Sequence, residues 1–117
     1  MLPKANRLNR RRDFDELFKR GRSMGDGFFT LRYVKTSTSS PIRVGFVISA
    51  KTEKSSVKRN RVRRQCREVL RKILPDLVPG HDAAILIKKP FLPLTFQEKQ
   101  EKITRLLARA GLLARKS

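Results

Sequence analysis

The chain has 117 residues and carries 29 lysines and arginines against 10 aspartates and glutamates, a formal net charge of +19. Such an excess repels itself in a compact domain and indicates a polyanionic partner, either nucleic acid or an anionic membrane. The length predicts a single domain over 1–117, and apolar runs such as Ala83 to Ile87 are too short to span a bilayer, so no membrane partner is expected.

Residues 1–8 are mostly basic and polar, and we predict that they form a flexible arm. A short helix is predicted next, capped by Asn9 or Asp13, running to about Lys19 and ended by Gly21. Its i, i+3 and i+4 positions carry Phe14, Leu17 and Phe18. Spacing alone favours packing of these side chains in the core.

Four later stretches favour a sheet. Ser23 to Gly27 indicates a turn or a bend in an edge strand, and the aromatic and β-branched residues of Phe28 to Lys35 predict a strand. Ile42 to Ser49 is the clearest strand, in which Gly45 marks a bulge or a close backbone approach. Ala83 to Lys88 predicts a buried strand that pairs parallel to Ile42 to Ser49 through the intervening helix.

That intervening helix is Lys58 to Lys72, with Ser55 or Ser56 as its cap and its end near Leu74, before a proline. At about 100° per residue, one arc collects Val62, Cys66, Val69, Leu70 and Ile73. The opposite arc collects Arg63, Arg64, Arg67 and Arg71 around Asn60. A basic helical face is often only solvated surface, but Glu68 is the only nearby acid, and the planar arginine fork suits bidentate phosphate contacts.

A last helix begins with Thr95 and Glu98, which form a capping box. Its apolar stripe is Phe96, Ile103, Leu106, Leu107 and Ala110. Gly111 is typical of a left-handed residue that ends a helix. The order of helix, strands, helix, strand and helix predicts an α+β sandwich, a small sheet covered by helices.

Catalytic groups are hard to find. His81 lies in a turn rich in proline and glycine, and Cys66 lies on the apolar arc, where a buried inert thiol is expected. A single cysteine excludes an internal disulfide and fits no zinc pattern, which favours the cytoplasm. The carboxylates are scattered and suggest no metal or acid–base site, so the sequence indicates a binding protein without catalytic residues of its own.

The helix also carries a resemblance to a known family. Arg59-Asn60-Arg61, continued by Val62-Arg63-Arg64 and Arg67-Glu68, resembles the RNR signature helix of the protein subunit of bacterial ribonuclease P. Further stretches similar to that family are Arg7-Leu8 with Asp13-Phe14, Leu17-Phe18 and Gly21, then Arg43 to Ser49 followed by Lys51, and Ala84 to Lys89 with Pro90. The resemblance covers residues 7–110.

The resemblance implies the order αβββαβα, with the basic helix in a left-handed crossover, where general rules favour a right-handed one. It also implies that the catalyst is an RNA, which removes the 5′ leader of precursor tRNA with magnesium bound in the ribonucleoprotein. The protein would bind no cofactor alone and require no protein partner. It would bind the catalytic RNA and hold the leader in a cleft between the first helix and the sheet.

The resemblance assigns two groups of residues. The expected contacts to the catalytic RNA are Lys58, Arg59, Asn60, Arg61, Arg63, Arg64, Arg67 and Arg71. The expected leader cleft contains Phe14, Phe18, Lys51, Lys89 and the pair Phe28 and Phe29, of which either could face the leader. Glu53 departs from the family by adding a negative charge near this cleft. A small basic RNA-binding protein of the ribosomal type is the main alternative, and a DNA-binding protein is a weaker one.

Overall fold

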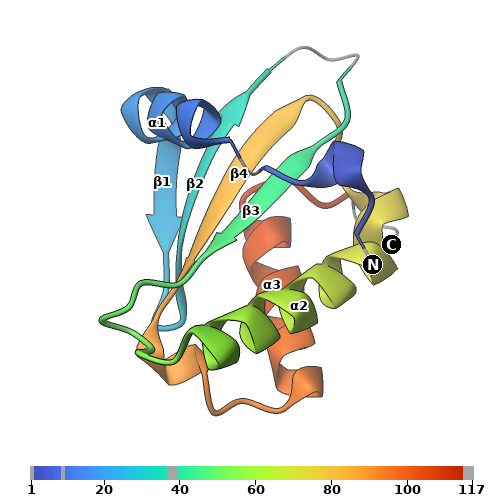
Figure 1. The fold of residues 1–117 in the computed structure, drawn as a ribbon. Helices are drawn as coiled ribbons and strands as arrows, with labels where there is room; N and C mark the ends of the chain where they lie inside the picture. The colour runs from blue at the N-terminus through green and yellow to red at the C-terminus, as the bar shows by residue number, and fades with distance from the viewer. Residues whose placement is uncertain (1, 9, 37–39, 115–117) are drawn as a thin grey trace.

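The computed structural model describes residues 2–8, 10–36 and 40–114 and contains one four-stranded sheet between helices (Figure 1). The elements in chain order are η1 (Lys4–Asn6), α1 (Arg11–Arg20), β1 (Arg22–Gly25), β2 (Phe29–Lys35), β3 (Arg43–Val47), α2 (Ser56–Ile73), η2 (Leu74–Asp76), β4 (His81–Ile87), η3 (Lys89–Phe91) and α3 (Phe96–Arg109). This order confirms the predicted α+β class, with β1 as an edge strand.

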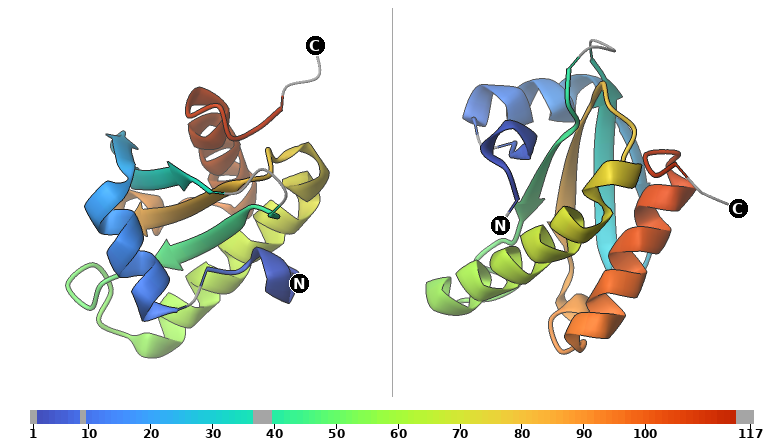
Figure 2. Two further views of the ribbon diagram at one scale, coloured as in Figure 1. Left: turned by 90° about the horizontal axis from the view of Figure 1, so that it is seen from above. Right: turned by 90° about the vertical axis from the view of Figure 1, so that its right-hand side faces the viewer.

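The strands lie in the order β1-β2-β4-β3, and only the β3–β4 pair is parallel. The chain reaches β4 from β3 through α2, as predicted. The two figures of the ribbon show that this crossover is left-handed, as the resemblance implied and against the general rule (Figures 1 and 2).

Two cores lie on opposite faces of the sheet. The larger core packs α2 and α3 against one face, with the rings of Phe29 and Phe91 at its centre, 4.7 Å apart between centroids. The smaller core lies under α1 and contains Leu8, Leu17 and Ala84, all 3% exposed or less. Helix α1 lies over one end of its face of the sheet (Figure 2).

The N-terminal segment differs from the free arm that we expected. Leu2 and Leu8 are 1% and 3% exposed, and the amide of Leu8 donates to the carbonyl oxygen of Val44 over 3.1 Å. The side chain of Asn6 donates to the carbonyl oxygen of Ile42 over 2.8 Å. Residues 2–8 therefore extend the edge at β3, an interaction between distant segments that local composition does not reveal.

The helix caps test the predicted boundaries. Ser55 accepts from the amide of Lys58 over 3.2 Å at the start of α2, and the Thr95–Glu98 capping box is present at α3. Gly111 has the expected positive φ, +76°. The proposed cap of α1 is wrong for Asp13, which lies inside the helix and pairs with Arg43 instead. The other candidate, Asn9, lies outside the described residues.

Candidate nucleic-acid interface

The outer side of α2 gathers most of the predicted basic residues. Arg63 donates to the amide oxygen of Asn60 over 2.5 Å, and about two turns further along α2 Arg71 pairs with Glu68 over 2.5 Å. Positions three, four and seven apart share one side of a helix, which explains the grouping. We call this group the basic face: Asn60, Arg63, Arg64, Arg67 and Arg71.

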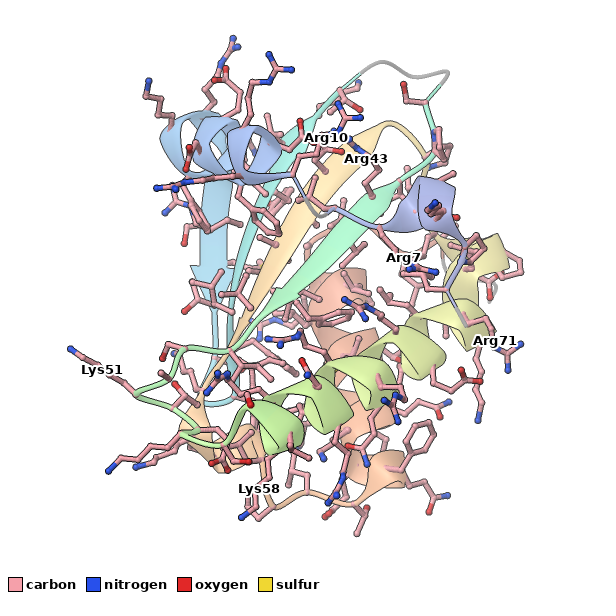
Figure 3. The ribbon with its side chains drawn as sticks, in the orientation of Figure 1. Arg7, Arg10, Arg43, Lys51, Lys58 and Arg71 are labelled. Carbon is pink, nitrogen blue, oxygen red and sulfur yellow. The ribbon has the colours of Figure 1, made fainter. Side chains whose placement is uncertain are left out.

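Arg67 is the most deeply placed cation of the basic face. Burial lowers its pKa from the ordinary value, and the charges of Arg7 and Arg63 lower it further. Arg7 extends from the N-terminal segment toward α2, and its Nε–H donates to the carbonyl oxygen of Leu2 over 2.9 Å (Figure 3). Arginine remains protonated near neutral pH, so three positive charges converge where an anion would relieve their repulsion.

A groove runs along β3 between α1 and α2. Residues that line it include Arg7, Phe14, Gly45, Val47, Arg63 and Arg67. Gly45 is required there, since a Cβ atom on this residue would lie 2.5 Å from Cζ of Phe14 and 2.7 Å from the carbonyl oxygen of Leu8. One wall of the groove is therefore aromatic and the other is cationic.

An ion-pair network holds α1 in place above the sheet. Arg43 of β3 donates to both carboxylate oxygens of Asp82 in β4, over 2.9 and 2.7 Å, and to Asp13 of α1 over 3.2 Å. The hydrogen bond to Asp82 is the main cause of the raised pKa of Arg43. This network ties α1 to both parallel strands and so positions Phe14 at the groove.

Phe18 lies one turn beyond Phe14 on α1 and is not among the residues that line the groove; its ring centroid is 6.3 Å from that of Phe14, and 38% of the residue is exposed. The guanidinium of Arg32 lies 5.6 Å from the Phe18 ring centroid and donates to the carbonyl oxygen of Phe18 over 2.5 Å. Sequence reasoning missed Arg32 and the role of Arg7. Strand alternation from a buried Leu31 could have placed Arg32 on the α1 face.

The predicted placement of Phe28 and Phe29 in the cleft is wrong. Phe29 is fully buried against Phe91 in the larger core, on the face away from α1. Phe28 is partly buried against the same core, and Nζ of Lys102 lies 5.0 Å from its ring centroid. The Asp26 carboxylate accepts from both Phe amides, which bends the chain just before β2 and sets this register.

Lys51 and Lys89, the other two expected leader contacts, do not line the groove. Lys51 points outward at the tip of the β3–α2 loop (Figure 3), and Lys89 is exposed at the start of η3. Both side chains can reach an RNA only outside the groove. The carboxylate of Glu53, which departs from the family pattern, is engaged within its own loop, where it accepts a hydrogen bond from the amide of Ser55 over 3.2 Å.

The three remaining predicted RNA contacts do not belong to the basic face. Arg59 turns inward and donates to the carbonyl oxygens of Glu53 and Lys54 over 2.6 and 3.0 Å. Arg61 and Lys58 lie about 100° and 160° around the helix from Asn60, and Figure 3 shows Lys58 at the opposite end of α2 from Arg71. The predicted group of eight is therefore divided among three sides of α2.

The residues considered for catalysis have other surroundings. Cys66 is fully buried, and burial raises the pKa of its thiol to about 12, in agreement with the inert thiol that we expected. His81 begins β4, and its Nδ1 lies 3.1 Å from the carbonyl oxygen of Pro79.

Among residues 2–8, 10–36 and 40–114, no three His, Cys, Asp or Glu side chains gather to hold a metal ion. No described helix is long and apolar enough to cross a membrane.

The left-handed crossover, the basic face and the aromatic groove beside it define a class of small basic α+β proteins that bind nucleic acid. Comparison with known proteins narrows the class. The family model for ribonuclease P matches residues 2–111. A ribonuclease P protein component of Synechococcus sp. is 39% identical over 116 residues, which cover 97% of this chain and 87% of the relative.

A second relative, from Symbiobacterium thermophilum, is 33% identical and covers 97% of this chain and 98% of its own length. The ribonuclease P protein of Thermotoga maritima is 29% identical with a TM-score of 0.79, covering 88% of this chain and 96% of that one. The Staphylococcus aureus ribonuclease P protein has a TM-score of 0.84 over 94% of this chain and 99% of that one, and at 23% identity it supports the fold.

The chain belongs to the ribonuclease P protein family. It is a protein component of this ribonucleoprotein, which takes part in tRNA processing, and its partner is the ribonuclease P RNA. The alternative interpretation, a small basic RNA-binding protein of the ribosomal type, is therefore not supported.

Proposed function

We propose that the protein binds the catalytic RNA with the basic face of α2 and holds the 5′ leader of precursor tRNA in the groove beside it. The observation that carries this proposal is the groove itself, in which Phe14 faces Arg63 and Arg67 across β3. The leader bases stack on the aromatic wall, and the phosphates lie toward the arginines. Base stacking on an aromatic side chain contributes about 1 to 3 kcal/mol per base.

In this proposal the protein supplies binding and the RNA supplies the chemistry. The carboxylates nearest the groove are already engaged, since Asp13 and Asp82 both accept from Arg43. They do not fit a magnesium site, and the magnesium of the ribonucleoprotein is held by RNA oxygens. The same proposal places the protein in the cytoplasm, which the single unpaired thiol of Cys66 supports.

A leader-length series tests the groove. The reconstituted ribonucleoprotein is titrated with mature tRNA and with precursors whose leaders grow one nucleotide at a time. Phe14→Ala should weaken binding of the longer precursors by about 5- to 150-fold, the equivalent of one lost stacking contact, and leave mature tRNA unchanged.

Phe28→Ala is the matched control, because Phe28 was also expected in the cleft but packs on the far side of the sheet. This variant should retain full discrimination for the leader. If Phe14→Ala weakens the binding of precursor and mature tRNA equally, Phe14 has only a packing role. Assembly with the catalytic RNA, measured in parallel, shows that each variant is folded.

A further inference from the structure

A second cationic surface lies at the far end of the sheet from α2, where α1 ends and β1 begins (Figure 1). Its principal side chains are Arg20, Arg22, Tyr33, Lys35 and His81, which surround one shallow hollow. We call this group the β1 corner. The strand register builds it, since Arg22 lies opposite Tyr33 and Lys35 lies opposite His81.

The β1 corner presents donors and little negative charge. Glu16 is the acid in contact with it, 3.2 Å from Arg20, and both side chains are more than half exposed, so this pair is weak. Asp82 follows His81 along β4, but both of its oxygens accept from Arg43 on the other face of the sheet. With Nδ1 of His81 beside the carbonyl oxygen of Pro79, Nε2 is the ring nitrogen left for a ligand.

A simpler explanation is that charges on an edge strand prevent pairing with other chains. That explanation accounts for Arg22, because β1 is one of the two edge strands of the sheet. It does not account for Lys35 and His81, since they lie on β2 and β4 inside the sheet order. An exposed lysine, a tyrosine and a histidine gathered beside Arg22 are better explained by a shared anionic ligand.

We propose that the β1 corner is a second contact for the phosphate backbone of the catalytic RNA. The proposal rests on the leader groove, which holds the substrate on the α1 face near α2. Tyr33 packs against the larger core on the opposite face, so the substrate does not cover the corner. The corner lies at the far end of the sheet from α2 (Figure 1), so in this proposal two separate segments of the catalytic RNA contact the protein, one at the basic face and one at the corner.

The test compares two variants of the full protein that each lose two exposed positive charges. Arg22→Ala with Lys35→Ala alters the corner, and Arg105→Ala with Arg109→Ala alters the exposed side of α3. Affinity for the catalytic RNA is measured between 50 and 200 mM salt. With B-DNA as a guide, the corner variant should lower the salt slope by about 1.8, so that its deficit in affinity is about 12-fold larger at 50 mM than at 200 mM salt, while the α3 variant should change the slope far less.

Equal effects of the two variants would show that affinity for the catalytic RNA depends only on net charge. An unchanged salt slope for the corner variant would show that the β1 corner makes no contact with the RNA. Either result overturns the proposal. Arg63→Ala is measured in the same series, because it tests the basic face independently. If Arg63→Ala lowers the slope and the corner variant does not, the corner assignment fails while the proposed function stands. Circular dichroism checks that the corner variant is folded.

Discussion

Arg59 is predicted to be an internal clamp of the β3–α2 loop, although it is the first arginine of the RNR signature. Its guanidinium donates to the carbonyl oxygens of Glu53 and Lys54 over 2.6 and 3.0 Å. A hydrogen bond from a charged donor contributes about 1.5 kcal/mol or more when buried, and Arg59 is only half-buried. Arg59→Ala should therefore destabilise the protein by about 1 to 2 kcal/mol, a fall of roughly 3 to 8 °C in Tm.

Two measurements separate this clamp from an RNA contact. Trypsin should cut the native loop of Arg59→Ala faster at Lys51 and Lys54, because the loop loses the donor that holds its carbonyl groups. The salt slope for binding the catalytic RNA should stay unchanged. Arg64→Ala is the matched control on the exposed basic face, and it should keep the Tm while lowering the salt slope by about 0.9.

The opposite pattern would refute the clamp. If Arg59→Ala keeps the native Tm and trypsin rate and lowers the salt slope as much as Arg64→Ala does, its guanidinium contacts RNA, as the resemblance implied.

Two further predictions concern buried groups. Lys99 is 5% exposed and donates to Oε1 of Gln65 over 2.7 Å, and burial lowers its pKa. The free-energy cost of burying the charged ammonium group is present at neutral pH and is relieved as the pH rises toward 10.5, where the group loses its proton. Lys99→Met should therefore raise the free energy of unfolding in urea by roughly 1 kcal/mol at pH 7 and by less at pH 10. Cys66, with a pKa of about 12, should resist iodoacetamide at pH 8 in the native protein and react once the protein unfolds. Rapid native labelling of Cys66, or a larger gain for Lys99→Met at pH 10, would contradict these expectations.

The fold was predictable where a local pattern and a local cap agree. Helix α2 shows this, since its apolar arc has a clear period and Ser55 supplies the cap. The parallel pairing of β3 and β4 followed from the helix between them. The packing of Leu2 and Leu8 was not predictable, because it depends on β3, more than thirty residues away, and not on neighbours in the sequence.

The candidate site was predictable only where the spacing of residues along a helix determines the side on which their side chains lie. The grouping of Arg63, Arg64 and Arg67 needed no tertiary information, and the structure places them together. The placement of Phe28 and Phe29 did need tertiary information, because a shift of one residue in a strand moves each side chain to the other face of the sheet. The Asp26 turn decides that register by fixing the amides of Phe28 and Phe29, and the sequence pattern offers both choices.

The RNR triplet itself cannot act as a single contact unit. Arg59 and Arg61 are two residues apart, which places them about 200° apart around α2. Asn60 lies between them on the basic face, Arg59 faces the loop, and Arg61 lies on the flank where Gln65 meets Lys99 of α3. An RNA that packs on Asn60 therefore has the two arginines on opposite sides of the helix. Arg61 can meet that RNA only if the RNA wraps around α2, whereas Arg59 contributes by holding the loop that starts the helix.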